Sequence, residues 1–363
     1  LWNTVSAATG YEVMMLKGDD MKTVAITTGT SYTFSGLSKD SVYWITVRAR
    51  VNGKPGRRAP AIWRQPNSGS CNGVISDNDL KIDAIVSPAS GRKFTSTQLG
   101  ATTAITVRVK NLDDAPVNNF DLKYSINGSP FVTENVTTTI AAGGTYTYSF
   151  ATTADLSAPG NYNLVVVVKN AAPDPVTAND TAFSLIRHAD NQPLNLGSYF
   201  VDNIETAVPE TYERDTVALN GLDRYDFSRT TIYGRLRTFV NSGMAYSGTK
   251  ALTLDANRLY MPGNTNYLTG TFNLVNYNAG TNDIRLDFQF NNHGQVPNDD
   301  NKIWIRGNDT QSWIEAYDLD DNQNDPGLYK KSVSIEVADL LAANGQNFSP
   351  SFQVRWGQWG QIA

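Results

Sequence analysis

The densest set of potential metal ligands lies near residue 320, in the run Asp318-Leu-Asp-Asp-Asn-Gln-Asn-Asp325. Carboxylate and amide oxygens are the ligands that a hard cation such as Ca²⁺ takes in proteins, so Asp318, Asp320 and Asp325 are candidate calcium ligands. The spacing is not that of an EF-hand, because the sixth residue counted from Asp318 is Gln323 instead of Gly and the twelfth is Tyr329 instead of Glu. The alternative is a solvated acidic loop without a metal.

Aromatic residues in the same part of the sequence are candidates for ligand binding. A sugar ring presents an apolar C–H face that stacks on Trp or Tyr, while Asn, Asp, Gln and Arg bind its hydroxyl groups. Five aromatic residues fall among such polar neighbours: Trp313, Tyr317, Tyr329, Trp356 and Trp359. The alternative is that they fill a core, and the alternation of Trp304 with Ile303 and Ile305 on a strand illustrates that case.

Catalytic patterns are missing from the sequence. A single Cys, Cys71, excludes an intrachain disulfide and a thiolate zinc cluster, and His188 and His293 are the only imidazoles. His293 has no nucleophile signature nearby, which favours a structural role in a turn over a role as general base. The Glu-x-Asp-x-x-Glu strand of laminarinase-type glycosidases, the Gly-x-Ser-x-Gly elbow, His-Glu-x-x-His and the P-loop are also absent. We therefore expect no active site in this chain, while a catalytic domain elsewhere in a parent polypeptide stays open.

Charge and hydropathy exclude two further classes of protein. The net charge is −5 and the pI is near 5.1, whereas a nucleic-acid binder needs a basic surface. No apolar run approaches the ~18 residues of a membrane-spanning helix. We therefore expect neither a nucleic-acid partner nor a membrane-spanning segment.

The elements that must position these residues are β-strands. Short runs rich in Val, Ile, Thr, Tyr and Phe recur between Gly, Asn, Asp and Ser, and several alternate with period two: 43–49, 104–109, 146–150, 162–168 and 283–290. Only Ile335–Asn344 has a helical pattern, and Gly345 is placed to end that helix in a left-handed C-cap. The pattern predicts an all-β chain of tandem β-sandwiches with one short helix.

Two polar breaks divide the chain into three modules. They predict domains at 1–66, 78–187 and 198–363, joined by linkers at 67–77 and 188–197. The first 70 residues hold 9 Lys/Arg against 4 Asp/Glu, whereas residues 191–363 hold 13 against 20. The sequence begins at Leu1 without an initiator Met and ends in an aromatic strand-like run. We therefore expect a piece of a larger polypeptide, in which Cys71 is a free thiol or has a partner outside this piece.

The first module resembles a fibronectin type III domain. The resemblance rests on Leu37, on Tyr43 six residues later, and on Val47 and Ala49 at alternating positions. The segment Gly53-Lys-Pro-Gly56 matches the final hairpin of that family. The resemblance implies a partial domain that serves as a spacer or adhesive module and has no catalytic residues.

The second module is similar to bacterial cell-adhesion-related Ig-like domains of the CARDB type. Three segments alternate like the strands of a seven-stranded sandwich: 79–88, 103–111 and 121–128. The closing segment Gly160-Asn-Tyr-Asn-Leu-Val-Val-Val-Val168 completes the likeness. The resemblance spans residues 78–187 and implies display or adhesion, with no site to transfer.

The third module resembles the MAM-like or carbohydrate-binding jelly rolls of secreted Bacteroidetes proteins. The matching segments are Asp202-Asn-Ile-Glu205, Ser247-Gly-Thr-Lys-Ala-Leu252, Leu286-Asp-Phe-Gln-Phe290 and Ile303-Trp-Ile-Arg-Gly307. In that family an acidic final strand helps to bind a structural calcium, and no such strand follows here, which implies a module incomplete at its C-terminus. The resemblance implies type IX secretion and makes Glu205 a calcium-ligand candidate.

Together these observations predict a non-catalytic segment of a large secreted or cell-surface bacterial protein. Its expected partners are an extracellular polysaccharide or protein surface and other domains of the same polypeptide, and its expected cofactor is structural calcium. One alternative is a set of accessory modules of a secreted hydrolase, such as a peptidase. The other is a structural spacer, or a filament subunit assembled by strand exchange.

Overall fold

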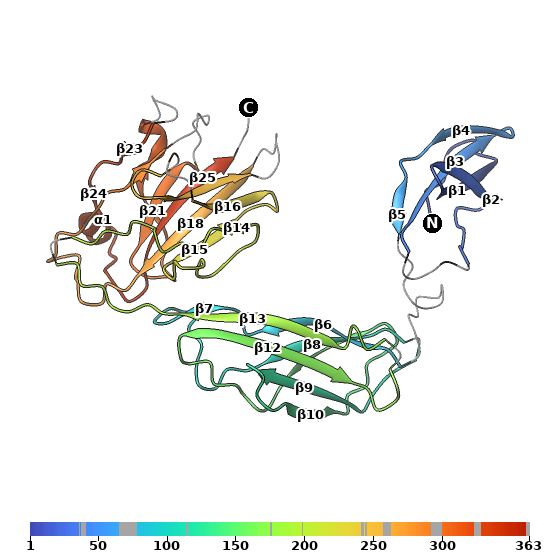
Figure 1. Ribbon diagram of the computed structural model, residues 1–363, viewed down its shortest axis with the longest axis horizontal. Coiled ribbons are helices and arrows are strands. Elements are labelled where there is room, and N and C mark those ends of the chain that lie inside the picture. The colour runs from blue at the N-terminus through green and yellow to red at the C-terminus, as the bar shows by residue number, and fades with distance from the viewer. Residues whose placement is uncertain are drawn as a thin grey trace.

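The computed structural model describes residues 1–35, 37, 41–64, 78–113, 115–174, 176–197, 199–240, 243, 245–256, 263–291, 300–322 and 328–360. Within these ranges the chain is nearly all β-structure, with one short α-helix and one 3₁₀ turn. Figure 1 shows the strands in three groups along the chain. The predicted all-β fold of tandem β-sandwiches is therefore confirmed. No helix in the described part of the chain is long and apolar enough to cross a membrane.

The first module contributes one five-stranded sheet. Its strands are β1 (Gly10–Lys17), β2 (Asp20–Thr27), β3 (Tyr43–Val51), β4 (Lys54–Arg58) and β5 (Ile62–Arg64). β1 lies between β2 and β3, and β3 also pairs with β4 and β5. The hairpin predicted around Gly53 is present, because Asn52 and Gly53 have positive φ angles of 50° and 75° and form the β3–β4 turn.

The second module is a sandwich of two sheets around one core. Its strands are β6 (Leu80–Ser87), β7 (Gly91–Arg92), β8 (Thr106–Asn111), β9 (Phe120–Ile126), β10 (Val132–Val136), β11 (Thr145–Ser149), β12 (Gly160–Lys169) and β13 (Thr181–Ala189). One sheet has the order β10-β9-β12-β13-β7 and the other the order β11-β8-β6. Alternate residues fill the space between the sheets, since Val107 and Val109 of β8 belong to the same buried cluster as Leu164 and Val166 of β12.

The third module is built around a five-stranded sheet with the order β15-β18-β25-β21-β22. A second sheet has the order β14-β16-β17, and two short ladders pair β19 with β24 and β20 with β23. The elements are β14 (Thr211–Tyr212), β15 (Tyr225–Arg229), β16 (Gly234–Val240), β17 (Lys250–Ala256), β18 (Asn264–Phe272), β19 (Arg285–Leu286), β20 (Gln289–Phe290), β21 (Lys302–Arg306), β22 (Ile314–Asp318), the 3₁₀ turn η1 (Leu319–Asn322), β23 (Lys330–Lys331), β24 (Ile335–Glu336), α1 (Val337–Ala343) and β25 (Phe352–Gly360). The aromatic run near the end of the sequence thus forms β25, the middle strand of the larger sheet (Figure 1).

The helix begins two residues later than the sequence predicts. Ile335 and Glu336 pair with β19 as β24, and α1 covers Val337–Ala343. The C-terminal end of the helix agrees with the predicted left-handed C-cap, because Gly345 has a φ of +66° and its N–H donates to Ala342 O at 3.1 Å. Gln346 N donates to Leu341 O at 2.9 Å, which completes a Schellman motif.

The two faces of the five-stranded sheet have different side chains. Ile303 and Ile305 of β21 are fully buried and pack with Val354 of β25 in the core. Because side chains alternate along a strand, Arg306 and Arg355 lie on the opposite, outer face. This outer face carries the candidate site.

Candidate functional site

Two guanidinium groups lie against the ring of Trp313 on the outer face. The Arg306 Cζ atom is 4.2 Å and the Arg355 Cζ atom 3.9 Å from the ring centroid. Arg355 also lies over Tyr267, at 4.7 Å, and the Tyr267 ring meets Trp304 edge-on at 6.0 Å. Cation–π contacts of this kind contribute about 0.5–2 kcal/mol each. We call these five residues the arginine–aromatic stack.

Strand register brings the stack together from distant parts of the sequence. Trp304 of β21 lies opposite Arg355 of β25, and Tyr267 of β18 lies opposite Gly357 of β25. The missing side chain at Gly357 leaves room for an indole, since a Cβ atom there would be 2.5 Å from Cζ3 of Trp304. A glycine at this one position therefore allows the Trp304 ring to lie across the strand.

The two arginines of the stack differ in their hydrogen bonds. Arg306 Nε donates to Gln353 Oε1 at 2.7 Å, and its Nη1 donates to the Gln311 carbonyl at 3.2 Å. Arg355 Nε is buried and has no hydrogen-bond partner among the described residues. Burial lowers the pKa of Arg355, and the neighbouring charge of Arg306 lowers it further, to about 10. Arg355 is therefore a cation that the described residues do not neutralise.

Trp313 also lines a shallow, open groove of about 680 Å³ beside the stack. The groove is lined by Thr310, Gln311, Ser312, Trp313, Ile314, Glu315, Asn344, Gly345 and Gln346. The Gln346 amide is held on both sides, because its Nε2 donates to Ser312 O at 2.9 Å and its Oε1 accepts from Gly307 N at 2.8 Å. The groove thus combines an aromatic wall with amide and carboxylate groups.

The structure separates the five aromatic residues that the sequence selects. Trp313 and Trp359 belong to the outer face, and Trp359 N donates to Asn301 Oδ1 at 2.8 Å. Tyr317 and Trp356 pack against the core, where both rings meet Phe288 edge-on. Tyr329 instead pairs with the exposed Tyr246, at a centroid distance of 5.6 Å. Trp313 is therefore the only one of the five that lines the groove.

The sequence does not select several members of the arginine–aromatic stack as candidate site residues. The alternation of Trp304 with Ile303 and Ile305 is compatible with a core position in the sequence, but period two places Trp304 on the face opposite those isoleucines. Arg355 carries no signal of its own in the sequence. The alternation of side chains along β21 is the sequence feature that could have predicted the outer-face position of Trp304 and Arg306.

Two of the predicted calcium ligands, Asp318 and Asp320, lie next to each other in the structure. Asp318 Oδ1 accepts from Asp320 N at 2.9 Å, and Asp320 Oδ1 accepts from Asn301 Nδ2 at 3.2 Å. Asp325, like His293, Cys71 and the predicted linker 67–77, lies outside the described residues. The described ranges contain no group of three or more His, Cys, Asp or Glu side chains that could hold a metal. Calcium binding stays a prediction from the sequence.

Glu205 has hydrogen-bond partners that explain the motif around it. Its Oε1 accepts from Thr249 N and Lys250 N, each at 2.9 Å, and its Oε2 accepts from Thr249 Oγ1 at 2.8 Å. These hydrogen bonds lower the pKa of Glu205, and the bonds from Thr249 have a larger effect than the bond from Lys250. Gly248 has a φ of +68°, and a Cβ there would be 2.5 Å from Glu205 Oε1. The Ser-Gly-Thr-Lys segment therefore forms a turn around this carboxylate.

Comparison with known proteins identifies the second module. Residues 77–173 match the CARDB family model. The match covers less than half of the chain, and it confirms the resemblance expected for this module alone. CARDB is a cell-surface-associated type of domain, so the coarse expectation of a surface domain is supported. Comparison with curated proteins gives no match.

Solved structures similar to the chain include two of the CARDB domain of a Pyrococcus furiosus protein. The solution structure is 21% identical over 30% of this chain and 94% of that chain, with a TM-score of 0.23. The crystal structure of that domain, in complex with di-metal ions, is 20% identical over 30% and 87%, with a TM-score of 0.22. The FN1–FN3 domains of chicken CNTN1 are 12% identical over 73% and 84%, with a TM-score of 0.17.

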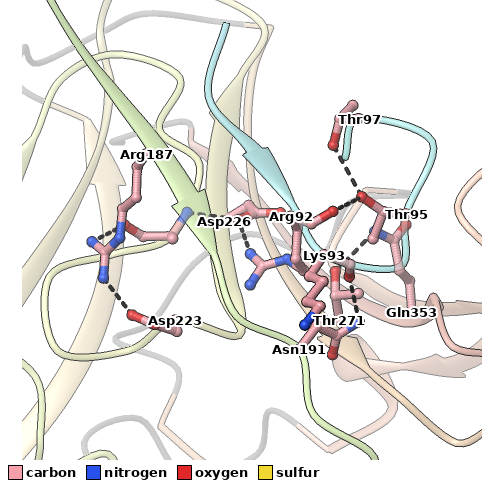
Figure 2. Close-up of polar contacts among 11 residues, drawn as sticks. Arg92, Lys93, Thr95, Thr97, Arg187, Asn191, Asp223, Asp226, Thr271 and Gln353 are labelled. Carbon is pink, nitrogen blue, oxygen red and sulfur yellow. Dashed lines mark hydrogen bonds and ion pairs between the residues drawn. The ribbon is translucent and has the colours of Figure 1, made fainter. Parts of the chain in front are cut away.

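The CARDB domain contacts the third module through polar side chains (Figure 2). Arg92, in β7, is 2% exposed and forms an ion pair with Asp226 of β15, whose carboxylate also accepts from Ala218 N at 2.8 Å. Arg187 of β13 pairs with Asp223 and donates to the Ala218 carbonyl at 2.8 Å. The end of the CARDB domain is therefore anchored to the third module by two arginines.

The segment predicted as the second linker takes part in the same contact. His188, Asn191 and Leu194 are each at most 8% exposed. Asn191 Nδ2 donates to Pro350 O at 2.7 Å, and Asn191 O accepts from Asn273 Nδ2 at 2.9 Å. Residues 188–197 thus join the two modules through packed contacts on both sides. We call this contact the junction.

Proposed function

We propose that this chain is a non-catalytic, extracellular segment of a larger surface protein, and that its third module binds a polysaccharide. In this proposal, the CARDB domain holds the third module so that the outer face of that module keeps a fixed orientation relative to the CARDB domain. The predicted domain boundaries at 66, 78, 187 and 198 belong to the same proposal. Other domains of the parent polypeptide, catalytic or not, would be carried on either side.

The single observation that carries the proposal is the position of Trp313. Its indole is held by Arg306 and Arg355 and at the same time lines an open groove with amide and carboxylate side chains. An aromatic wall that is fixed in advance loses little conformational entropy on binding. Amide groups beside such a wall are suited to the hydroxyl groups of a sugar that packs against the part of the indole facing the groove.

The junction supports the display role. Interfaces between domains of one chain commonly permit relative motion unless the interface is large and apolar, and a buried ion pair opposes separation because it would leave each charge without its partner. Here the buried Arg92, the half-buried Arg187 and the Asn191 side chain bond across the junction. The groove would therefore keep its orientation relative to the CARDB domain.

Binding to an array of neutral and acidic glycans, with the whole chain, tests the proposal. Trp313→Ala is expected to weaken binding about tenfold by removing the aromatic wall. Ser312→Trp, at an exposed position of the groove, is expected to block binding without disturbing the core. Trp63→Ala is the matched control, because Trp63 is a 56% exposed indole in the first module. Absence of binding to every glycan, with and without calcium, would contradict the proposal.

A second candidate function is assembly with another chain, and one observation favours it. Phe183 and Leu185 alternate on β13 of the CARDB domain and are 75% and 62% exposed. Exposed apolar side chains on a sheet face are typical of protein–protein contact sites. Sedimentation of the chain at increasing concentration tests this candidate, and a monomer at every concentration would exclude it.

A further inference from the structure

We propose that Asp180 carries a proton that it donates to the Asp174 carboxylate, and that this proton makes the contact between the β12–β13 loop and the start of β6 sensitive to pH. Asp174 and Asp180 belong to the loop, and Asp79 directly precedes β6. We call these three residues the acid clasp. They lie at the end of β13 remote from the junction (Figure 1). The inference goes beyond the proposed function, because it assigns a pH-sensitive contact to the CARDB domain itself.

Hydrogen bonds join the β12–β13 loop to the first residues of β6. Leu80 N donates to Asp174 Oδ2 at 2.9 Å, and Asn179 Nδ2 donates to Asp79 Oδ1 at 3.0 Å. Ile82 N donates to the Asn179 carbonyl at 3.2 Å. Asp79 is 0% exposed, so these bonds enclose its carboxylate. The start of β6 is therefore held by loop residues that follow it by 94 and 100 positions in the sequence.

The pattern of hydrogen bonds indicates which carboxyl group holds the proton. Both oxygens of Asp174 accept backbone N–H groups, since Oδ1 accepts from Val176 N at 2.8 Å and Oδ2 from Leu80 N. Asp180 lies within hydrogen-bonding reach of this carboxylate, and Asp180 Oδ1 is buried without a partner among the described residues. An ionised carboxylate only accepts hydrogen bonds, whereas a protonated one donates an O–H. A proton on Asp180 therefore turns the contact between two acceptors into a hydrogen bond.

The charges around Asp180 act in the same direction. Burial raises the pKa of Asp180, and the charges of Asp174 and Asp79 raise it further, to about 6. Of the neighbouring lysines, Lys81 forms an ion pair within β6, and Lys169 at the end of β12 is exposed. A carboxyl group whose pKa is raised by folding stabilises the fold fully below its ordinary value of 3.8, and this contribution is lost as the pH rises through the folded value. The acid clasp should therefore hold more tightly at pH 5 than at pH 8.

Hydrogen exchange of the whole chain measures how often the acid clasp opens. Peptides that cover the amides of Leu80 and Ile82 are compared by mass spectrometry at pH 5 and pH 8, after correction for the intrinsic exchange rates. The opening constant is expected to be about three- to tenfold larger at pH 8, because Asp180 is ionised there and faces two other carboxylates. A chelator is present throughout, so that no divalent cation takes the place of the proton.

Asp180→Asn separates this effect from that of other groups that titrate. Its amide Nδ2 donates to Asp174 at every pH, as the protonated acid does. The variant is therefore expected to open at pH 8 no more often than the unsubstituted chain does at pH 5. Asp83→Asn is the matched control on β6, because the hydrogen bonds from Lys81 and Arg108 lower the pKa of Asp83. This control is expected to show the reverse, with more frequent opening at pH 8 than in the unsubstituted chain.

The outcomes do not depend on glycan binding, so failure of this inference is distinct from failure of the proposed function. More frequent opening of Asp180→Asn than of the unsubstituted chain at pH 8 would overturn the inference, because the ionised carboxylate would then be the stabilising form. Equal opening of the unsubstituted chain at pH 5 and pH 8 would overturn it as well. With calcium in place of the chelator, a stabilisation that Asp180→Asn lacks would assign the cluster to a cation instead of a proton. Opening that increases with pH in the unsubstituted chain and stays low in Asp180→Asn would support the inference.

Discussion

Arg92 of the CARDB domain and Asp226 of the third module form an ion pair in which the arginine side chain is only 2% exposed. Arg92 Nη1 is buried as well and has no hydrogen-bond partner among the described residues. An arginine buried this deeply is costly to desolvate, so the pair depends on both partners staying in contact. The junction between the two modules is therefore a structural element and not a flexible connection.

Arg92→Ala is expected to destabilise the junction strongly. Removing one partner of a buried ion pair leaves the other uncompensated and typically costs about 3–5 kcal/mol. Chemical denaturation of the whole chain should show this loss, and small-angle scattering should show a wider range of angles between the modules. Arg108→Ala is the control, because Arg108 is 45% exposed in its pair with Asp83 and such pairs contribute about 1 kcal/mol or less. Equal effects of the two substitutions would contradict a rigid junction.

The first module should lose stability in acid through Glu12. This residue is 4% exposed and pairs with both Arg48 and Arg50. Burial alone would raise the pKa of Glu12, but the hydrogen bonds and charges of the two arginines lower it below 4.5. A carboxyl whose pKa is lower in the folded state stabilises the fold above its unfolded pKa, and this contribution disappears as the pH falls through the folded pKa.

Glu12→Gln tests this assignment by calorimetric unfolding of the whole chain between pH 7 and pH 3. The variant is expected to be less stable at pH 7 by about 1.5–3 kcal/mol, the range for hydrogen bonds to charged groups. As the pH falls below 4.5, the difference in stability between the variant and the unsubstituted chain should shrink, because Glu12 becomes protonated in the unsubstituted chain. Asp20→Asn is the control, since Asp20 is 73% exposed in its pair with Lys22. A difference that stays constant across the pH range would rule out titration of Glu12.

Local patterns in the sequence predict the strands and the end of the helix, but not the stack. Gly345 marks the helix C-terminus because a left-handed residue must follow the last turn, and that requirement is local. Arg306 and Arg355 become neighbours only through the pairing of β21 with β25, across almost fifty residues of intervening chain. Register of this kind depends on the packed core, which a single sequence does not reveal. The burial of Asn191 and Leu194 in a predicted linker has the same origin.

Calcium, if the sequence prediction holds, should raise the unfolding temperature of the third module. A ligand that binds only the folded state at about 100 times its dissociation constant contributes about 2.7 kcal/mol, which corresponds to roughly 5–10 °C for a module of this size. Asp320→Asn is expected to reduce the shift. Glu205→Gln should lower the unfolding temperature equally with calcium and with chelator, because the Glu205 carboxylate bonds to Thr249 and Lys250. An unfolding temperature that calcium leaves unchanged would remove the metal from the proposal.

Gly357 is expected to be indispensable for the outer face. A Cβ atom there would lie 2.5 Å from Asp300 O as well as from the Trp304 ring, and a backbone carbonyl cannot move away cheaply. Gly357→Ala should therefore cost about 1–3 kcal/mol, the range for overpacking, and should shift the tryptophan fluorescence as the Trp304 ring is displaced.

The matched control for Gly357→Ala is Gly280→Ala. Its nearest neighbour would be the side-chain oxygen of Asn278 at 3.3 Å, which can adjust by a small movement. Since Trp304 supports Tyr267, and Tyr267 lies under Arg355, Gly357→Ala should also weaken any polysaccharide binding at the outer face while Gly280→Ala leaves it unchanged. A Gly357→Ala variant that folds and binds like the unsubstituted chain would show that the Trp304 ring does not support the stack.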